Sequence, residues 1–464
     1  MADYDVMVIG AGPGGYVAAI RAKQLGLNAA IVEREHLGGT CLNWGCIPTK
    51  ALLKTAEIKH YMENAAEFGL KVDNISFDLN SVVQRSRKIA QQLAGGIGHL
   101  MKKNKVPVLN GHAKLLGGGK LSVTDESGKA EIHSAKHIII ATGARARELP
   151  SIKPDGKLIW TAREAMVPDA MPKSMVIVGS GAIGIEFASF YNAMGCDVTV
   201  VELLDRIVPN EDAEISALAE KSFTQQGIKI VTGAMVESAK SEGEAVRVKI
   251  KQGENIEEKL VDRVILAVGI VGNTENIGLD KTKVKVEKGQ IIADPNGATA
   301  EPGVYAIGDV AGAPWLAHKA SHEGIHCVEH IAGKQHGRQM TKQSIPGCTY
   351  SYPQIASIGL TEVQAKEEGR QIKVGRFPYQ ANGKALAMGE KTGLIKTIFD
   401  AKTGEFLGAH MIGAEVTELI QGFAIAQALE TTEEELMQTV FPHPTLSEMM
   451  HESVLEAYDQ AIHI

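Results

Sequence analysis

Two of the five cysteines, Cys41 and Cys46, stand five positions apart. In a regular helix the Cα atoms of residues i and i+5 are ~8.6 Å apart, whereas a disulfide needs about 4.4–6.8 Å. A disulfide between these two cysteines therefore requires an irregular turn. Breaks in the backbone are predicted on both sides of the pair, at Gly38, Gly39, Gly45 and Pro48.

Redox chemistry is the function that this pair favours. In an intracellular protein a disulfide is typically redox-active rather than structural, and the alternative is two buried structural cysteines. A metal site is disfavoured because no second Cys or His pair stands at ligand spacing. Lys50 follows Cys46 closely, and its charge would favour a thiolate. The isolated Cys196, Cys327 and Cys348 are predicted to be small core residues.

A candidate acid–base group lies near the C-terminus, where His443 stands between Pro442 and Pro444. The two prolines restrict the backbone around the imidazole. Imidazole titrates near neutral pH, which suits proton exchange with a thiol. A helix is expected over 446–458, with Thr445 and Glu448 forming a capping box. That box explains Glu448 structurally, and the alternative is that Glu448 orients His443.

A nucleotide-binding unit must precede the cysteines, because the apolar strand before Gly10 runs into Gly10-Ala11-Gly12-Pro13-Gly14-Gly15. Such glycines allow a tight turn against a pyrophosphate, and the helix that follows supplies N–H groups. A second strand over 28–32 ends in Glu33, 23 residues after Gly10, where an acid binds a ribose hydroxyl.

The same pattern recurs later in the chain. A strand over 174–178 leads into the turn Gly179-Ser180-Gly181-Ala182-Ile183-Gly184, a helix over 185–194 and a strand over 197–201. Glu202 follows Gly179 by 23 residues. The acid favours NAD or FAD over NADP, although Arg206 leaves phosphate binding open. The alternative is a duplicated packing unit that binds no nucleotide.

Three further segments are predicted to return to these sites: buried strands ending in small-residue turns over 136–144 and 262–269, and a strand over 303–310 that ends in Gly308-Asp309. The last of them ends near Asp309, whose carboxylate suits a ribityl or ribose hydroxyl. The first unit then resumes after the second. Two dinucleotide units in one chain predict electron transfer between a flavin and a nicotinamide.

Composition agrees with an α/β enzyme. The 464 residues are 44% apolar and 22% charged with 49 glycines, and the net charge of −7 disfavours nucleic-acid binding. Acids near the N-terminus disfavour a cleaved signal, and no apolar run reaches the length of a membrane helix. We therefore expect a cytoplasmic protein, with a mature mitochondrial matrix chain as the alternative.

The motifs together resemble those of the flavoprotein disulfide reductases, the class I pyridine nucleotide-disulfide oxidoreductases. Within that family they are most similar to the dihydrolipoyl dehydrogenases. The resemblance extends from Asp5 to about His451 and includes the segments 38–50, 306–309, 316–319 and 443–448. It implies two nested Rossmann-like domains and an α+β dimerisation domain. The implied domains are an FAD-binding domain (1–148), an NAD-binding domain (149–272), a central domain (273–342) and an interface domain (343–464).

The resemblance also implies an activity. The enzyme would reoxidise protein-bound dihydrolipoyl groups with NAD, serving the lipoyl-bearing acyltransferases of 2-oxo acid dehydrogenase complexes, with glycine cleavage complexes as a further alternative. It would act as a homodimer in which the His443 segment of one subunit completes the active site of the other. Cys46 would be the thiolate against the flavin, and Cys41 would exchange with substrate. His443 would accept the substrate proton and be oriented by Glu448, and Lys50 would pair with Glu186.

Cofactor contacts are implied in the same way. FAD would contact Gly10, Gly12, Gly14, Gly15, Glu33, Thr40, Lys50, Ala113, Thr142, Gly143, Ala144, Asp309 and Ala317. NAD would contact Gly179, Gly181, Gly184, Glu202, Met235 and Gly269.

Two departures from the family pattern stand out. The family often has Arg and Pro in the segment that here reads Gly269-Ile270-Val271-Gly272-Asn273, which leaves NAD contacts over 270–272 open. Trp44 replaces a common valine and is expected beside the disulfide.

Two other functions remain open, namely a glutathione-type reductase that uses NADP and a binding subunit without turnover. Glu202 argues against the first, and the Cys, Lys50 and His443 motifs argue against the second.

Overall fold

The computed structural model describes residues 2–334 and 340–464. The chain forms two compact units. Unit 1 comprises Met1–Ala51, Asn80–Arg147 and Gly269–Met340, and unit 2 comprises Leu52–Leu79, Glu148–Val268 and Thr341–Ile464. The first unit resumes after the second, so the predicted nesting is confirmed. Within the described residues, every helix is too short or too polar to cross a membrane.

Unit 1 is built on a parallel sheet with strand order β3-β2-β1-β6, and β19 also pairs with β6. Strands β5 and β4 extend the sheet in antiparallel fashion. Its strands are β1 (Tyr4–Ile9), β2 (Ala29–Glu33), β3 (Val108–Asn110), β4 (His112–Gly117), β5 (Lys120–Thr124), β6 (Ala130–Ile140) and β19 (Val304–Ala306). Short pairs are β7 (Ala144–Ala146) with β16 (Ile270–Gly272) and β17 (Val286–Glu287) with β18 (Gln290–Ile291).

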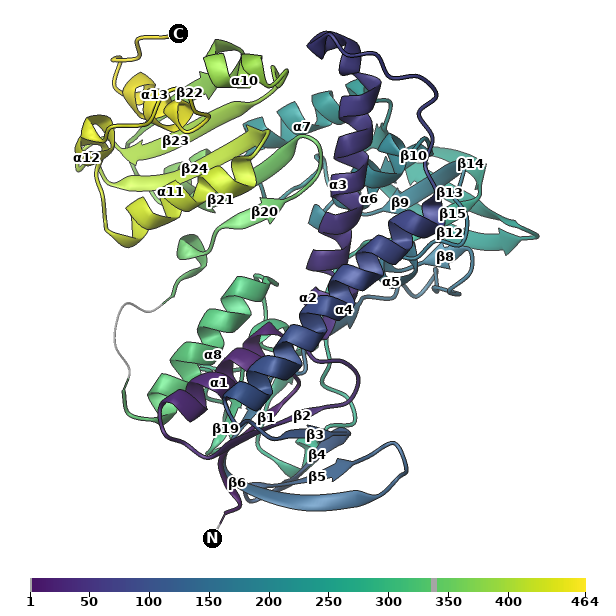
Figure 1. Ribbon diagram of the computed structural model, residues 1–464, viewed down its shortest axis with the longest axis vertical. Coiled ribbons are helices and arrows are strands. Elements are labelled where there is room, and N and C mark those ends of the chain that lie inside the picture. The colour runs from purple at the N-terminus through teal and green to yellow at the C-terminus, as the bar shows by residue number, and fades with distance from the viewer. Residues whose placement is uncertain (1, 335–339) are drawn as a thin grey trace. The chain divides into compact units, whose positions relative to one another are not determined.

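Both faces of this sheet are covered, which explains the unbroken apolar run in β1. Val6 and Val8 belong to a core that also contains Ala18 of α1, whereas Met7 and Ile9 belong to a core on the opposite face. Helices α1 and α8 lie side by side (Figure 1). The helices are α1 (Pro13–Gln24), α2 (Gly39–Trp44), the start of α3 (Cys46–Glu63), α4 (Leu79–Lys103) and α8 (Ala317–Ile331).

The nucleotide-binding part of unit 2 repeats this plan. Its parallel sheet has the order β11-β10-β9-β15-β8, and a separate antiparallel sheet has the order β12-β13-β14. The strands are β8 (Ile159–Trp160), β9 (Ser174–Val178), β10 (Asp197–Val201), β11 (Lys229–Val231), β12 (Ala234–Glu242), β13 (Ala245–Gln252), β14 (Asn255–Val261) and β15 (Arg263–Leu266). The helices are α5 (Ala162–Ala165), α6 (Ala182–Ala193) and α7 (Ala213–Gln225).

The C-terminal part of unit 2 is an antiparallel sheet with the order β20-β21-β24-β23-β22 (Figure 1). Helices α11 and α13 pack against it, and Phe423, Met449 and Val454 contribute to its core. The strands are β20 (Gly347–Thr349), β21 (Gln354–Gly359), β22 (Ile372–Pro378), β23 (Leu394–Asp400) and β24 (Phe406–Gly413). The helices are α9 (Glu362–Glu367), α10 (Gly383–Ala387), α11 (Val416–Ala428), α12 (Glu433–Gln438) and α13 (Glu448–Ala457).

Candidate active site

The two cysteines lie on either side of a helix break. Cys41 is in α2 and Cys46 begins α3, and Gly45 between them has φ −154° and ψ −119°, outside the helical region. A side chain at Gly45 would bring its Cβ to 3.0 Å from the carbonyl oxygen of Thr40. The predicted break at Gly45 is therefore confirmed. The break predicted at Pro48 is wrong, because Pro48 lies in the first turn of α3, where no N–H is needed.

The Cys41 and Cys46 side chains are hydrogen-bonded to each other. The pKa of Cys41 is raised well above its ordinary value, chiefly by that hydrogen bond and also by burial. The positive charge of Lys50 acts in the opposite sense. Cys41 therefore keeps its proton, and the negative charge of a reduced pair is favoured on Cys46.

Polar contacts hold the break in place. The Asn43 side chain donates to the carbonyl oxygens of Leu37 and Gly39 at 3.0 and 2.9 Å. Arg87 donates to the carbonyl oxygen of Asn43 at 2.6 Å, and its guanidinium lies 4.0 Å from the centre of the Trp44 ring. Neither Asn43 nor Arg87 was predicted from the sequence. The contact with Arg87 comes from α4, 43 positions after Trp44, and no local pattern indicates it.

Both glycine-rich turns have the same internal packing. A Cβ at Gly10 would lie 2.4 Å from the Ala141 oxygen, and one at Gly179 would lie 2.5 Å from the Ala267 oxygen. A Cβ at Gly15 or Gly184 would strike the carbonyl oxygen of the first glycine of its turn, at 1.8 and 2.1 Å. These four glycines are therefore required for packing of strand against helix.

The middle glycines differ from these four. A Cβ at Gly12 would approach only the Gly39 Cα atom, at 4.0 Å, and one at Gly181 would approach nothing within 4 Å. Both residues cap twelve-residue helices, α1 and α6. Open space before a helix N-terminus is what a pyrophosphate needs. Both turns therefore fit a dinucleotide.

Each turn is paired with the acid predicted for it. Glu33 accepts a hydrogen bond from the N–H of Ala11 at 2.7 Å. Glu202 accepts from the N–H and the hydroxyl of Ser180 at 2.8 and 2.6 Å. The two carboxylates are thus held beside the turns, with further lone pairs for ribose hydroxyls. Arg206 donates to the carbonyl oxygen of Pro209 within its own loop.

Other predicted nucleotide contacts occupy loops at the ends of strands. The hydroxyl of Thr142 donates to the Asn273 oxygen at 2.8 Å, and the N–H of Asn273 donates to the Gly143 oxygen at 2.9 Å. Burial raises the pKa of Asp309, which lies in unit 1 with Lys319. The segment 270–272 is β16, paired with β7. The remaining predicted contacts are Gly14 in α1, Thr40 in α2, Lys50 in α3, Ala113 in β4, Ala144 in β7, Met235 in β12, Gly269 before β16 and Ala317 in α8.

The predicted acid–base pair is joined directly. Nδ1 of His443 lies 2.9 Å from Oε1 of Glu448, and the N–H of Thr445 donates to Oε2 at 2.8 Å. Burial raises the pKa of Glu448, but these two hydrogen bonds outweigh it and hold the pKa below its ordinary value. The His443 side chain is 79% exposed, so its ring can receive a proton from a molecule outside the unit.

The predicted helix start is wrong. Helix α13 begins at Glu448 with Ser447 as its N-cap. The Thr445 hydroxyl donates to the Pro442 oxygen, so only the Glu448 half of the capping box forms. Glu448 therefore fixes both the imidazole and the loop that carries it.

Glu186, predicted to pair with Lys50, is buried in α6. Its carboxylate accepts a hydrogen bond from the N–H of Tyr350 at 3.0 Å. Cys41, Cys46 and Lys50 belong to unit 1, whereas Glu186, His443 and Glu448 belong to unit 2. The pairing of Lys50 with Glu186 stays a prediction.

Comparison with known proteins covers nearly the whole chain. Residues 4–324 match the family model described as pyridine nucleotide-disulphide oxidoreductase, and residues 345–454 match its dimerisation domain. The chain is 55% identical to the dihydrolipoyl dehydrogenase of Rhizobium etli, over 99% of both chains. It is 53% identical to that of Zymomonas mobilis, over 100% of both.

A solved structure agrees with the fold. The crystal structure of LpdA from Mycobacterium tuberculosis matches with a TM-score of 0.91 at 26% identity, over 97% of this chain and 98% of that one. The flavoprotein disulfide reductase RclA from Escherichia coli, which is induced by HOCl, matches with a TM-score of 0.86 at 25% identity, over 97% and 99% of the two chains.

Proposed function

This chain belongs to the pyridine nucleotide-disulphide oxidoreductase family, and on that premise we propose that it oxidises dihydrolipoyl groups with NAD through Cys41 and Cys46. It is an FAD-dependent disulfide oxidoreductase that uses NAD(H), and its dimerisation domain supports a homodimer. The observation that carries the proposal is the hydrogen-bonded cysteine pair at the α2–α3 break.

The catalytic cycle starts from the oxidised pair. His443 takes a proton from one thiol of the substrate, and the resulting thiolate attacks Sγ of Cys41. The Cys41–Cys46 bond breaks, and its electron pair stays on Cys46. The second substrate thiol then attacks the mixed disulfide, which releases the cyclic disulfide product and leaves Cys41 as a thiol. The two electrons of the substrate now reside on the cysteine pair.

Other side chains bind the two cofactors and orient the His443 imidazole. Bound FAD would supply a two-electron acceptor beside the cysteines, and bound NAD would supply the final hydride acceptor, so that the cysteines could return to the disulfide. The first glycine turn with Glu33 would hold FAD, and the second with Glu202 would hold NAD. Glu448 holds the imidazole through Nδ1, which leaves Nε2 to exchange a proton with the substrate thiol. Lys50 would favour the thiolate of Cys46.

The partners follow from the same proposal. The substrate dithiol would be carried on the lipoyl-bearing acyltransferases of 2-oxo acid dehydrogenase complexes. In the homodimer, His443 of one subunit would serve the cysteine pair of the other, as the family resemblance implies. We propose a cytoplasmic location, as the relatives named above are bacterial proteins.

The test is an assay of the purified holoenzyme that compares two substrates, dihydrolipoamide and glutathione disulfide. Each substrate is assayed with NAD(H) and with NADP(H). We expect rapid reduction of NAD by dihydrolipoamide and slow reduction of NADP. Preferred turnover of glutathione disulfide with NADPH would replace this proposal with a glutathione-type reductase. An anaerobic titration with dihydrolipoamide should change the flavin spectrum of wild-type protein, and the absence of any change would exclude dithiol oxidation.

A further inference from the structure

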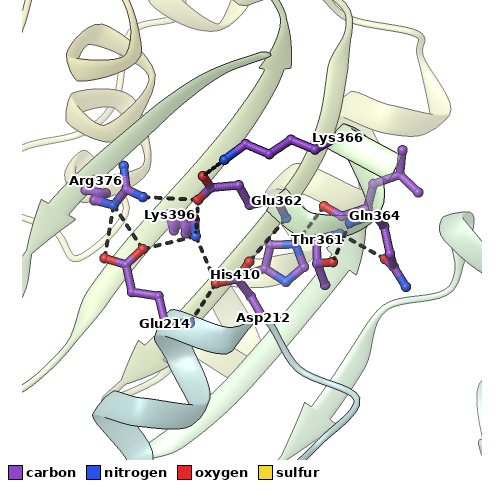
Figure 2. Close-up of polar contacts among 10 residues, drawn as sticks. Asp212, Glu214, Thr361, Glu362, Gln364, Lys366, Arg376, Lys396 and His410 are labelled. Carbon is purple, nitrogen blue, oxygen red and sulfur yellow. Dashed lines mark hydrogen bonds and ion pairs between the residues drawn. The ribbon is translucent and has the colours of Figure 1, made fainter. Parts of the chain in front are cut away.

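A buried ion cluster in unit 2 is not used by the proposed reaction. The Lys396 side chain is 2% exposed, and its ammonium lies 2.9 Å from Asp212, 3.0 Å from Glu214 and 2.8 Å from Glu362 (Figure 2). Arg376 bridges Glu214 and Glu362 from the outer side. Buried ion pairs add little net stability, because desolvation offsets their attraction. Such a cluster is better explained by what it holds in position.

The cluster joins two parts of unit 2 that are distant in the sequence. Asp212 and Glu214 begin α7 in the nucleotide-binding part, whereas Lys396 lies in β23 of the C-terminal sheet (Figure 2). Asp212 is the N-cap of α7, where its side chain accepts a hydrogen bond from the N–H of Glu214. Its second carboxylate oxygen accepts from the N–H of Glu362 at 3.2 Å. Lys396 thereby fixes the start of α7.

The loop that ends at Asp212 contains a backbone outlier. Val208 has φ +38°, a conformation that β-branched residues rarely adopt. Its N–H donates to the Ser180 oxygen in the second glycine turn at 3.1 Å. Its own oxygen accepts from the N–H of Glu211 at 2.9 Å and from the hydroxyl of Ser216 at 3.3 Å. Such strain persists only when the surroundings impose it.

The first nucleotide-binding unit provides an internal comparison. There the N–H of Gly38 donates to the Ala11 oxygen at 2.9 Å, as Val208 does to Ser180. Gly38 has φ +89°, which glycine adopts at no steric cost. The same contact to a glycine turn is therefore made by an unstrained residue in unit 1 and by a strained valine in unit 2. Only the strained one is followed, four residues later, by an aspartate bound to a buried lysine.

We propose that Lys396 is a positioning residue for the nicotinamide dinucleotide. Through Asp212 it holds the Val208 turn against Ser180, and so keeps Ser180 and Glu202 in the geometry that binds the adenosine ribose and pyrophosphate. The inference rests on the proposed placement of NAD at the second glycine turn. Without the ammonium, the turn relaxes from its strained conformation and NADH binding weakens, while the first turn keeps its flavin.

The test is a fluorescence titration of purified holoenzymes with NADH. We expect Lys396→Met to raise the Kd about tenfold, equivalent to 1.4 kcal/mol, with an unchanged content of FAD per chain. The matched control is Lys366→Met, because Lys366 also pairs with Glu362 but is 60% exposed and lies on the rim of the cluster. Its Kd should stay near wild type. An unchanged Kd in folded Lys396→Met would overturn the inference.

A double-mutant cycle tests the path through Val208. Val208→Gly removes the strain, so in that background we expect Lys396→Met to raise the Kd by less than about threefold. An equal rise of the Kd in both backgrounds would show that Val208 does not transmit the effect of Lys396 to the NADH site. If Lys396→Met fails to fold, Asp212→Asn replaces it, since asparagine still caps α7 but removes the charge. If wild-type holoenzyme does not bind NADH, the proposed function fails instead.

Discussion

Nδ1 of His443 lies 2.9 Å from Oε1 of Glu448, and the second oxygen of that carboxylate accepts the N–H of Thr445. One carboxylate therefore fixes the imidazole and its loop together. With Nδ1 engaged, Nε2 is the nitrogen left to exchange a proton with the substrate.

His443→Gln should reduce turnover of dihydrolipoamide by about 10²–10⁴-fold, the range for loss of a general base. Reduction of an artificial dye by NADH, which needs no proton transfer from a dithiol, should fall only slightly. Steady-state assays of both reactions on one preparation provide the comparison. Equal losses in the two assays would contradict an acid–base role. Glu448→Gln should lie between wild type and His443→Gln, because its imidazole is present but less well oriented.

Cys46→Ser should abolish dihydrolipoamide oxidation while FAD stays bound, because no disulfide can form. Cys41→Ser should also abolish turnover. The thiol that remains in this variant is Cys46, on which negative charge is favoured. We therefore expect Cys46 in Cys41→Ser to react faster with iodoacetamide at neutral pH than Cys41 does in Cys46→Ser. Alkylation followed by peptide mass spectrometry measures both rates. Normal lipoamide turnover by Cys46→Ser would falsify the mechanism.

Two substitutions in one glycine turn should impair different properties, NADH binding in one case and stability in the other. At Gly181 an added Cβ meets nothing within 4 Å, so Gly181→Ala should fold normally but weaken NADH binding about tenfold by filling the pyrophosphate space. At Gly184 the Cβ would lie 2.1 Å from the Gly179 oxygen, so Gly184→Ala should destabilise the protein by about 1–3 kcal/mol. Thermal unfolding and NADH titration separate the two effects. Similar melting temperatures for both variants would count against this difference.

Stability should depend on pH through the Lys396 cluster. Hydrogen bonds from Lys366 and Lys396 lower the pKa of Glu362 to about 2, from an ordinary 4.5. Because the folded pKa is the lower one, this stabilisation is complete above pH 4.5 and is lost as pH falls toward 2. Glu362→Gln should therefore lower the melting temperature at pH 6, and the gap to wild type should close at acid pH. Glu367→Gln, on the exposed side of the same helix, is the control, and a gap that stays constant with pH would contradict the prediction.

Much of the nucleotide-binding framework could be predicted from the sequence. Strands β9 and β10 have the predicted bounds, because strands buried on both faces are continuous apolar runs and the glycines mark their ends. Helix α6 begins at Ala182 rather than at the predicted 185, since the residues after the second glycine of the turn are already helical. The start of α13 was misplaced because Thr445 and Ser447 are both acceptable N-caps by type, and the choice depends on the contact of Thr445 with Pro442.

The Lys396 cluster could not be predicted. Asp212 and Lys396 are separated by 184 positions and meet only because α7 packs against β24, the neighbour of β23 in the sheet. Val208 likewise carries no local signal of its backbone conformation, since valine is typical of strands.

The two glycine turns allow a comparison within one polypeptide. Each polypeptide carries the same loop contact twice, once at Gly38 without strain and once at Val208 with it. Temperature, salt or crowding act on both copies in the same tube. If the proposed placement of the two dinucleotides holds, the ratio of nicotinamide affinity to flavin affinity would cancel their shared response and would report the effect of the strain at Val208 alone.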